Sequence, residues 1–376
     1  MSRPWAEAHV GRFQELCRIP SPSLAEAAVA KLLTSQLDSL GIAWKADEAG
    51  TQLGGDQGNI LCLIPGVDDS RRVLLAAHLD TVPPGDVIAP VLSEGSWRNS
   101  GDGILGVDNK AAVAALLTAA AVWAESPPAV SVVLAFTVAE EISLLGSRAL
   151  ALTPEKYTCG FVFDHPTPIG SWVAVSPAHH RLELVFIGRA SHAGVDPEGG
   201  ASAISAATDA LASIKFGRID EETTTNAGTI HGGSAINVVP AQCTVVCEVR
   251  SMNESTLVEE TKKIIDAAHG GAQKYGCSVD VVVTPSFRGY RHDESHIGVL
   301  AADKALTAIG IQPEAIASAG GSDANVFEEM GIPTLNLGDG STGTHTPDEQ
   351  ITNEDLLRLV ELVLGLPAAV ADATSG

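Results

Sequence analysis

The pattern of hydrophobic and polar residues along the first part of the chain predicts alternating helices and strands. Residues 6–16 and 24–40 carry apolar side chains at helical spacing, and residues 111–123 form an apolar helix that ends before a Pro-Pro pair. Between these helices lie short apolar segments with hardly a polar interruption, which are typical of strands buried on both faces. These segments are residues 59–64, 72–78, 131–138 and 160–163. The order predicts an α/β architecture in which helices cover a buried sheet.

The pattern changes near His179. Residues 181–187 alternate, so that Leu182, Leu184 and Phe186 are predicted to face inward. The helix predicted over residues 201–214 would bury a single stripe of side chains, and that stripe consists of Ile204, Ala207, Leu211 and Ile214. The following elements complete the β-α-β-β-α-β order of a ferredoxin-like α+β unit. They are strands at residues 225–230, 243–250 and 278–284, with a helix at residues 254–275.

The α/β pattern resumes after Ser286, with a helix at residues 297–309, a strand at residues 334–337 and a last helix at residues 353–364. A chain of 376 residues is long enough for two domains. We therefore predict a discontinuous α/β domain, residues 1–178 and 287–376, with an inserted α+β domain at residues 179–286.

The composition of the chain argues against binding to nucleic acid, against a membrane-spanning segment and against secretion. The 23 Lys and Arg residues against 46 Asp and Glu residues give a net charge of −23, and such a surface repels the phosphates of nucleic acid. The most apolar long run, residues 111–124, is shorter than the roughly 20 residues that a bilayer requires. The N-terminus lacks the apolar region of a signal peptide, and none of the six cysteines forms a Cys-x-x-Cys pair. We therefore predict a reduced, cytoplasmic protein.

Candidate metal ligands follow the predicted strands at similar places. In an open α/β sheet, ligands bind beyond the carboxyl ends of the strands, so side chains at these positions converge on one edge. Taken singly, each is more often a turn residue or a solvated charge. The candidates are His78, Asp108, one of the pair Glu140 and Glu141, Asp164 and His345.

The combination of ligand types indicates a divalent metal. Two neutral imidazoles and three carboxylates suit borderline ions such as Zn²⁺, Mn²⁺ or Co²⁺. Three carboxylates neutralise most of the charge on two such ions, and one of them can bridge the pair at roughly 3.5–4 Å. The sequence therefore favours a site for two ions.

Seven short motifs are spread over most of the chain. Ala77-His78-Leu79-Asp80-Thr81-Val82-Pro83-Pro84-Gly85 is the first of them, and the others occupy residues 106–110, 137–141, 191–194, 237–240, 320–325 and 344–349. In sequence and in order they resemble the motifs of the dinuclear zinc hydrolases that include carboxypeptidase G, peptidase T and the aminoacylases. The Ser-His-Ala-Gly and Gly-Gly-Ser-Asp-Ala-Asn forms look most like the peptidase T-like branch. The resemblance implies that the inserted domain acts as a lid and dimerisation domain.

The resemblance implies a role for each catalytic-domain residue. His78 and Asp164 would hold one metal, Glu141 and His345 the other, and Asp108 would bridge both through a turn with a cis peptide to Asn109. Asp80 would accept a proton from the second imidazole nitrogen of His78 and so orient it. Glu140 would be the general base, which takes a proton from the metal-bridging water and delivers it to the leaving amine.

The resemblance also assigns residues of the inserted domain. His192 would reach the active site of the partner subunit in a homodimer and stabilise the tetrahedral intermediate. Asn237 and Arg250 would contact the substrate, Arg250 through a carboxylate; a turn residue and a strand-edge charge are the open alternatives. Four further histidines have no assigned role, and the middle two are interpreted as hinge or solvated residues: His165, His179, His180 and His231.

The identity of Asp164 favours one substrate class. In the resembled family this position tends to be Asp in enzymes that act at free amino termini, and Glu in carboxypeptidase-like and acylase-like members. We therefore expect a tripeptidase-like aminopeptidase that cleaves small peptides. An amidohydrolase that removes an acyl group from an amino acid is the first alternative, and a non-catalytic metal-binding scaffold is the second.

Overall fold

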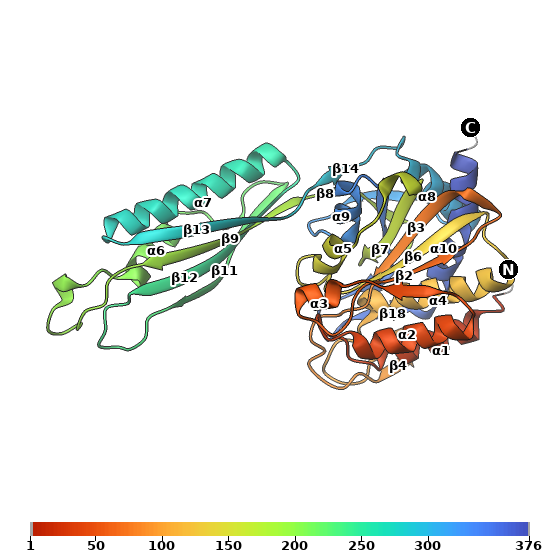
Figure 1. Cartoon of the computed structure of the whole chain (residues 1–376), viewed down its shortest axis with the longest axis horizontal. Coiled ribbons are helices and arrows are strands. Elements are labelled where there is room, and N and C mark those ends of the chain that lie inside the picture. The colour runs from red at the N-terminus through yellow and green to blue at the C-terminus, as the bar shows by residue number, and fades with distance from the viewer. Residues whose placement is uncertain (1–2, 375–376) are drawn as a thin grey trace. The chain divides into compact units, whose positions relative to one another are not determined.

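The computed structural model describes residues 3–374, which form two compact units (Figure 1). Unit 1 consists of Met1–Ala174, Arg291–Ala317 and Ser322–Gly376, and unit 2 of Val175–Tyr290 and Ser318–Gly321. The mixed α/β fold, interrupted by a smaller α+β unit, confirms the predicted fold class. The domain boundaries at residues 178/179 and 286/287 stay a prediction, since compactness does not test which part folds by itself.

A nine-stranded mixed sheet forms the centre of unit 1. β3 pairs in parallel with β6 on one side and β7 on the other, and β16 pairs in parallel with β7. His78, the last residue of β3, lies opposite Thr137 at the end of β6. The carboxyl ends of these four strands therefore meet at one edge of the sheet. The strand order is β1 (Trp44–Ala46), β2 (Ile60–Ile64), β6 (Val130–Thr137), β3 (Asp68–His78), β7 (Cys159–His165), β16 (Thr334–Gly338), β8 (Ser171–Ser176) and β14 (Tyr290–Arg291), with β15 (Glu314–Ala317) beside β8.

Five long helices of unit 1 contribute to one hydrophobic core with this sheet. The helix α4 is long and apolar enough to cross a membrane by length and composition alone, but 78% of that segment is buried inside the protein. It is therefore the core helix of the unit, packed on β3 and β7 (Figure 1). The five helices are α1 (Ala6–Cys17), α2 (Ala27–Ser39), α4 (Val107–Glu125), α8 (Ile297–Ala308) and α10 (Asn353–Ala373); α3 (Ala49–Leu53), α5 (Leu145–Ala149) and α9 (Asp323–Glu329) are short.

Several helix boundaries differ from the prediction, and two of the differences have a clear physical reason. α2 begins at Ala27 rather than at residue 24, because Leu24 has a positive φ of 70° and cannot continue a helix. α10 continues past residue 364 to Ala373 with Pro367 inside it, since its last turns remain buried against the core. A small sheet was also missed because its strands are too short to show a period: β17 (Ser341–Thr342), β18 (Gln350–Thr352), β5 (Ser96–Asn99) and β4 (Pro90–Ser93).

Unit 2 is an antiparallel sheet with two helices packed on one face. Leu182, Leu184 and Phe186 are buried, as the alternation predicts. Polar or half-exposed residues alternate with them on the opposite face. The sheet order is β10 (Gly217–Arg218), β11 (Thr223–Gly232), β12 (Gln242–Ser251), β9 (Ala178–Ile187) and β13 (Ser278–Phe287), and the helices are α6 (Ala203–Ala212) and α7 (Glu254–Lys274).

The predicted stripe of α6 packs against the core of unit 2, but only Ala207 among its members is fully buried. Its buried residues are alanines, whereas Ile204 and Leu211 are only partly buried and Ile214 lies beyond the helix end. The reason is the close approach of α7, where a Cβ at Gly271 would lie only 2.5 Å from the carbonyl oxygen of Ala206. Only small side chains fit between α6 and α7, whereas the prediction placed the larger hydrophobic side chains of α6 there. The buried residues are Ala203, Ala206, Ala207 and Ala210.

Candidate metal centre

The five predicted metal ligands of unit 1 lie together at the carboxyl edge of its large sheet. His78 ends β3, Asp164 lies near the end of β7, and Glu141 follows β6. Asp108 is placed by a turn at the start of α4, where Gly106 has a φ of 74° and the Asp108–Asn109 peptide is cis, as predicted. His345 comes from the loop after β17, also with a positive φ of 64°.

Histidine nitrogens and carboxylate oxygens face each other at short distances in this cluster. The Nε2 atom of His78 lies 3.1 Å from Oδ1 of Asp108 and 3.6 Å from Oδ1 of Asp164. The Nε2 atom of His345 lies 2.9 Å from Oε1 of Glu141 and 3.3 Å from Oδ2 of Asp108. The two oxygens of Asp108 thus face two different imidazoles, which is the placement that a bridging carboxylate requires.

The donor set fits divalent metal ions. Two overlapping groups of side chains have all their ligand atoms within 4.8 Å of one another. Ligands about 2.0–2.1 Å from a tetrahedral ion lie about 3.3–3.4 Å apart, which is close to the distances in this cluster. Buried carboxylates in such number also require positive charge nearby. The two groups are His78, Asp108 and Glu141, and His78, Glu140 and Asp164.

Burial and mutual repulsion shift the acidic groups of the cluster. Burial, followed by the charge of Asp164, raises the pKa of Glu140 well above its usual range. Burial likewise raises the pKa of Asp164 to about 7, against the opposing contact with His78. The carboxylates Asp108 and Glu141 raise the pKa of His345 to about 10. These pKa shifts arise because the buried carboxylates have too little positive charge around them. Bound metal ions would supply that charge.

Asp80 holds the backbone that carries the two glutamates. Its carboxylate accepts hydrogen bonds from the backbone N–H of Glu140 at 3.0 Å and of Glu141 at 3.1 Å, and from the hydroxyl of Ser23 at 2.6 Å. The Nδ1 atom of His78 lies 2.9 Å from the carbonyl oxygen of Asp80 and 3.5 Å from its carboxylate. The imidazole is therefore oriented mainly by the Asp80 carbonyl, whereas the prediction used the carboxylate.

Three further buried acids support the cluster, and sequence reasoning gave none of them a role. Glu26 accepts hydrogen bonds from the backbone of Leu24 and Ala139, and burial raises its pKa to about 7. Glu349 accepts them from Gly106 at 2.5 Å and from Asp108 at 3.3 Å, so it fixes the turn that carries the bridging ligand. Asp323 accepts a hydrogen bond from Thr137. Glu349 and Asp323 lie inside motifs, whereas Glu26 had no signal.

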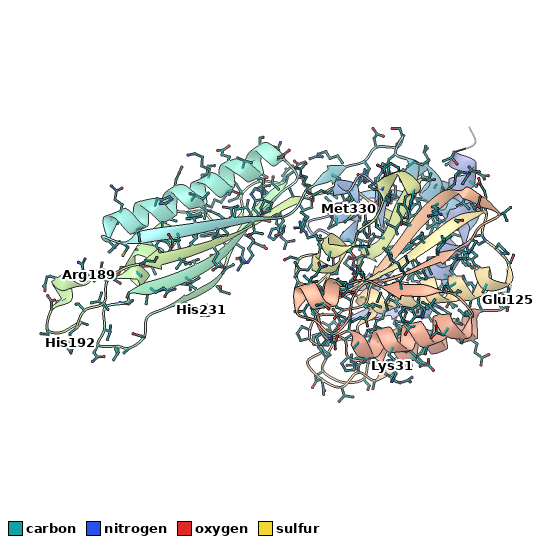
Figure 2. The ribbon with its side chains drawn as sticks, viewed as in Figure 1. Lys31, Glu125, Arg189, His192, His231 and Met330 are labelled. Atoms are coloured by element: carbon teal, nitrogen blue, oxygen red, sulfur yellow. The ribbon has the colours of Figure 1, made fainter. Side chains whose placement is uncertain are left out.

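The predicted residues of unit 2 have different surroundings. His192 is exposed in a loop after β9, with its Nδ1 atom accepting a hydrogen bond from the Gly194 backbone at 3.2 Å (Figure 2). Asn237 is exposed, and its carbonyl accepts a hydrogen bond from the Ala193 backbone. Arg250 on β12 pairs with Glu248 at 3.2 Å. These residues stay predictions, because their chemistry depends on a substrate or partner.

His179 is not a solvated residue. Its side chain is buried, lies 3.2 Å from the Glu248 carboxylate and packs on Phe287 with ring centroids 5.3 Å apart. The solvated interpretation failed because His179, on the face of β9 opposite to Leu182 and Leu184, is covered there by Phe287 and Glu248. His180 is half-buried and contacts Thr261.

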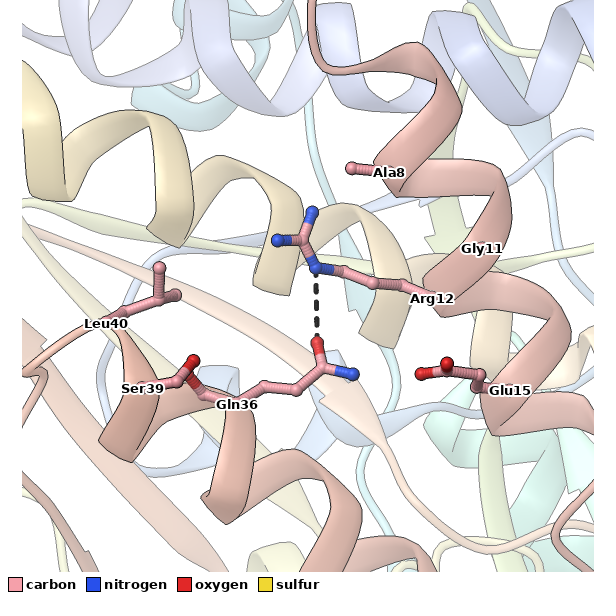
Figure 3. A pocket seen from close by; sticks show the side chains of 7 residues that line it. All are labelled: Ala8, Gly11, Arg12, Glu15, Gln36, Ser39 and Leu40. Atoms are coloured by element: carbon pink, nitrogen blue, oxygen red, sulfur yellow. Dashed lines mark hydrogen bonds between the residues drawn. The ribbon is translucent and has the colours of Figure 1, made fainter.

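A surface pocket of about 230 Å³ lies between α1 and α2, outside the predicted site (Figure 3). The Nε atom of Arg12 donates a hydrogen bond to Oε1 of Gln36 across it at 3.1 Å. None of the predicted ligands lines this pocket. The pocket therefore has no part in the metal centre.

Comparison with known proteins identifies relatives over almost the whole chain. The model of the peptidase family M20/M25/M40 matches residues 74–368. The protein YqjE of Bacillus subtilis (strain 168) is 33% identical over 355 residues, covering 94% of this chain and 96% of YqjE. The crystal structure of aminopeptidase PepT from Bacillus cereus is 34% identical with a TM-score of 0.84, covering 97% of this chain and 99% of that one. A tripeptidase from Staphylococcus aureus is 29% identical with a TM-score of 0.87 and the same coverage.

Proposed function

We propose that this chain, which belongs to the peptidase family M20/M25/M40 and is a peptide hydrolase, is a dinuclear metal-dependent aminopeptidase that cleaves small peptides as a tripeptidase does. The observation that carries the proposal is Asp108, whose two carboxylate oxygens face His78 and His345 separately. The similarity to an aminopeptidase and to a tripeptidase over 97% of the chain supports the substrate class, as does the Asp at position 164.

The ligands would divide between two ions. His78 and Asp164 would hold one, Glu141 and His345 the other, and Asp108 would contact both. Zn²⁺ is the metal we expect, with Mn²⁺ or Co²⁺ as substitutes, because the donors are imidazole and carboxylate. Such ions, when bound, polarise a carbonyl and lower the pKa of water.

Glu140 would move the proton. Glu140 is 8% exposed, its backbone N–H is held by Asp80, and one of its carboxylate oxygens lies within 4.8 Å of ligand atoms of His78 and Asp164. Positive charge beside it favours the ionised form, which can take a proton from the attacking water. The same carboxyl group can then give that proton to the leaving amine.

Residues of unit 2 would complete the binding of substrate. We propose that His192 acts in the active site of the partner subunit of a homodimer, where its imidazole stabilises the charge that develops on the carbonyl oxygen. Asn237 and Arg250 would contact the peptide. The protein would work in the cytoplasm on peptides rather than on nucleic acid or a membrane.

A library of short peptides distinguishes this function from removal of acyl groups. The metal-loaded enzyme is incubated with di-, tri- and tetrapeptides and with N-acetylated copies of each, and the products are identified by mass. We expect release of the N-terminal residue from free tripeptides and no turnover of the acetylated copies. Hydrolysis of N-acetyl amino acids at a higher rate would instead make the protein a deacylase. The Glu140→Gln variant provides the blank for contaminating peptidases.

A further inference from the structure

A second set of metal-ligand side chains lies in unit 1 and shares no residue with the predicted centre. His292 follows β14, His296 precedes the first residue of α8, and Glu328 lies near the end of α9. One nitrogen of each histidine and one oxygen of Glu328 lie within 4.8 Å of one another. Residues 32 and more positions apart in the sequence are thus brought together by the fold.

His296 has two buried ring nitrogens without a hydrogen-bond partner in the described part of the chain, and a bound ligand would explain them. Both of its ring nitrogens are inaccessible to solvent, and neither has a hydrogen-bond partner among residues 3–374. A buried polar group without a partner costs about 1–3 kcal/mol. Such a group in a folded protein needs an explanation, and a bound ion or water is the usual one.

The distances in this cluster suit a metal better than direct hydrogen bonds. The Nε2 atom of His296 lies 3.4 Å from Oε1 of Glu328, and the Nε2 atom of His292 lies 3.6 Å from the same oxygen. Both distances exceed the 2.7–3.2 Å of ordinary hydrogen bonds. They match the spacing of about 3.3–3.4 Å between ligands that each lie about 2.0–2.1 Å from a tetrahedral zinc ion.

The first residue of β16 holds two of the three side chains in place. The backbone N–H of Thr334 donates a hydrogen bond to Oε1 of Glu328 at 2.5 Å, and its carbonyl oxygen accepts one from Nε2 of His292 at 3.0 Å. The ligand oxygen is therefore fixed before an ion arrives.

We propose that His292, His296 and Glu328 form a separate binding site for one zinc ion. The ion would replace the Nε2 proton of His292, which would give up its hydrogen bond to the Thr334 carbonyl oxygen, and would leave a fourth position for water. The two rings are stacked with centroids 3.9 Å apart, so they would turn until both lone pairs point at the ion. The site would tie the start of α8 to the end of α9, which makes it structural rather than catalytic.

Zinc counting in two backgrounds tests the site. In the first background, His78→Ala and His345→Ala disable the predicted catalytic centre; in the second, that centre is intact. The full-length chain is loaded with zinc, passed through a desalting column and analysed for metal. We expect about one zinc ion per chain in the first background and about three in the second. His296→Gln and Glu328→Gln should each remove one ion in both backgrounds.

Controls separate this site from adventitious binding and from misfolding. His231→Gln removes an exposed histidine of unit 2 and should leave every count unchanged (Figure 2). Cobalt should give the visible absorption of a tetrahedral ion in the first background, and Glu328→Gln should abolish it. Retention of the full count by His296→Gln, or no zinc in a folded first background, would overturn the proposal. Neither result depends on catalytic turnover, so the proposed function is judged separately.

Discussion

The predicted site residues of unit 1 and those of unit 2 have opposite surroundings. His78 is 2% exposed and Glu140 is 8% exposed, whereas His192 and Asn237 lie on the surface of loops. The buried acids of unit 1 shift one another's pKa strongly. The buried cluster thus has the perturbed acids that are typical of functional sites. The proposed roles of the unit 2 residues depend instead on a substrate or a second chain.

The largest effect should come from the buried base of unit 1. Glu140→Gln keeps the size of the side chain but cannot accept a proton, so turnover should fall by about 10²–10⁴. Metal content, measured by elemental analysis, should stay the same. Glu125→Gln, an exposed glutamate at the end of α4, is the matched control and should be as active as the parent (Figure 2). Near-normal turnover of Glu140→Gln would remove this residue from catalysis.

The exposed histidine of unit 2 should matter almost as much, though nothing buries it. His192→Ala removes one donor to the developing oxyanion and should lower turnover by about 10²–10³ without changing metal content. His231→Ala, another exposed histidine of the same unit, should have no effect.

Mixing inactive chains tests where His192 acts. Chains with His192→Ala and chains with Glu140→Gln are mixed and allowed to exchange subunits. If His192 serves the partner's site, each mixed dimer contains one site with both residues and regains about half of the parent activity. Continued inactivity, with exchange shown by an independent label, would place His192 in the site of its own chain.

Removal of one metal ligand should lower the number of bound ions by one. His345→Ala removes one imidazole that faces Glu141 and Asp108, so one of the two ions should be lost preferentially. The count is made in the Glu328→Gln background, so that the separate site does not contribute. At most one ion per chain before the substitution would contradict the dinuclear centre.

His9 is a buried histidine with no proposed function, and it should give the smallest of the predicted effects, a change of stability with pH. Burial lowers the pKa of His9 to about 4, while its Nε2 atom donates to the Leu356 carbonyl and its Nδ1 atom accepts from Thr118. The unfolded chain binds this proton near pH 6.5 and the folded chain only near pH 4. The free energy of unfolding should therefore fall by about 3 kcal/mol as the pH drops through that interval.

Tryptophan fluorescence isolates this effect, because all five tryptophans lie in unit 1. Denaturant titrations of the parent and of His9→Gln at several pH values between about 4 and 7 give the difference in unfolding free energy. That difference should shrink as the pH falls, since only the parent carries the titrating group. A constant difference would mean that His9 does not titrate in this range.

The sequence by itself determined much of the site in unit 1. Apolar strands followed by His78, Asp164 and the Glu140–Glu141 pair predict a buried sheet, and parallel strands bring their carboxyl ends to one edge. The resemblance to the zinc hydrolases added Asp108 as a bridging ligand and implied its cis peptide to Asn109, which the structure has. Local pattern suffices where function depends on the position of a residue within a strand or turn.

Tertiary structure decided what depends on contacts between distant segments. Alanines face the core from α6 because α7 lies very close to it. The hydrophobicity of the side chains alone does not predict the distance between two helices. Glu26 reaches the Ala139 backbone across 113 positions, and Glu328 meets His292 and His296 because α8 and α9 both pack against β7 and β16. A periodic pattern records which side of an element is buried. It does not record which buried or polar groups from other elements will lie opposite, because that depends on the packing of the whole chain.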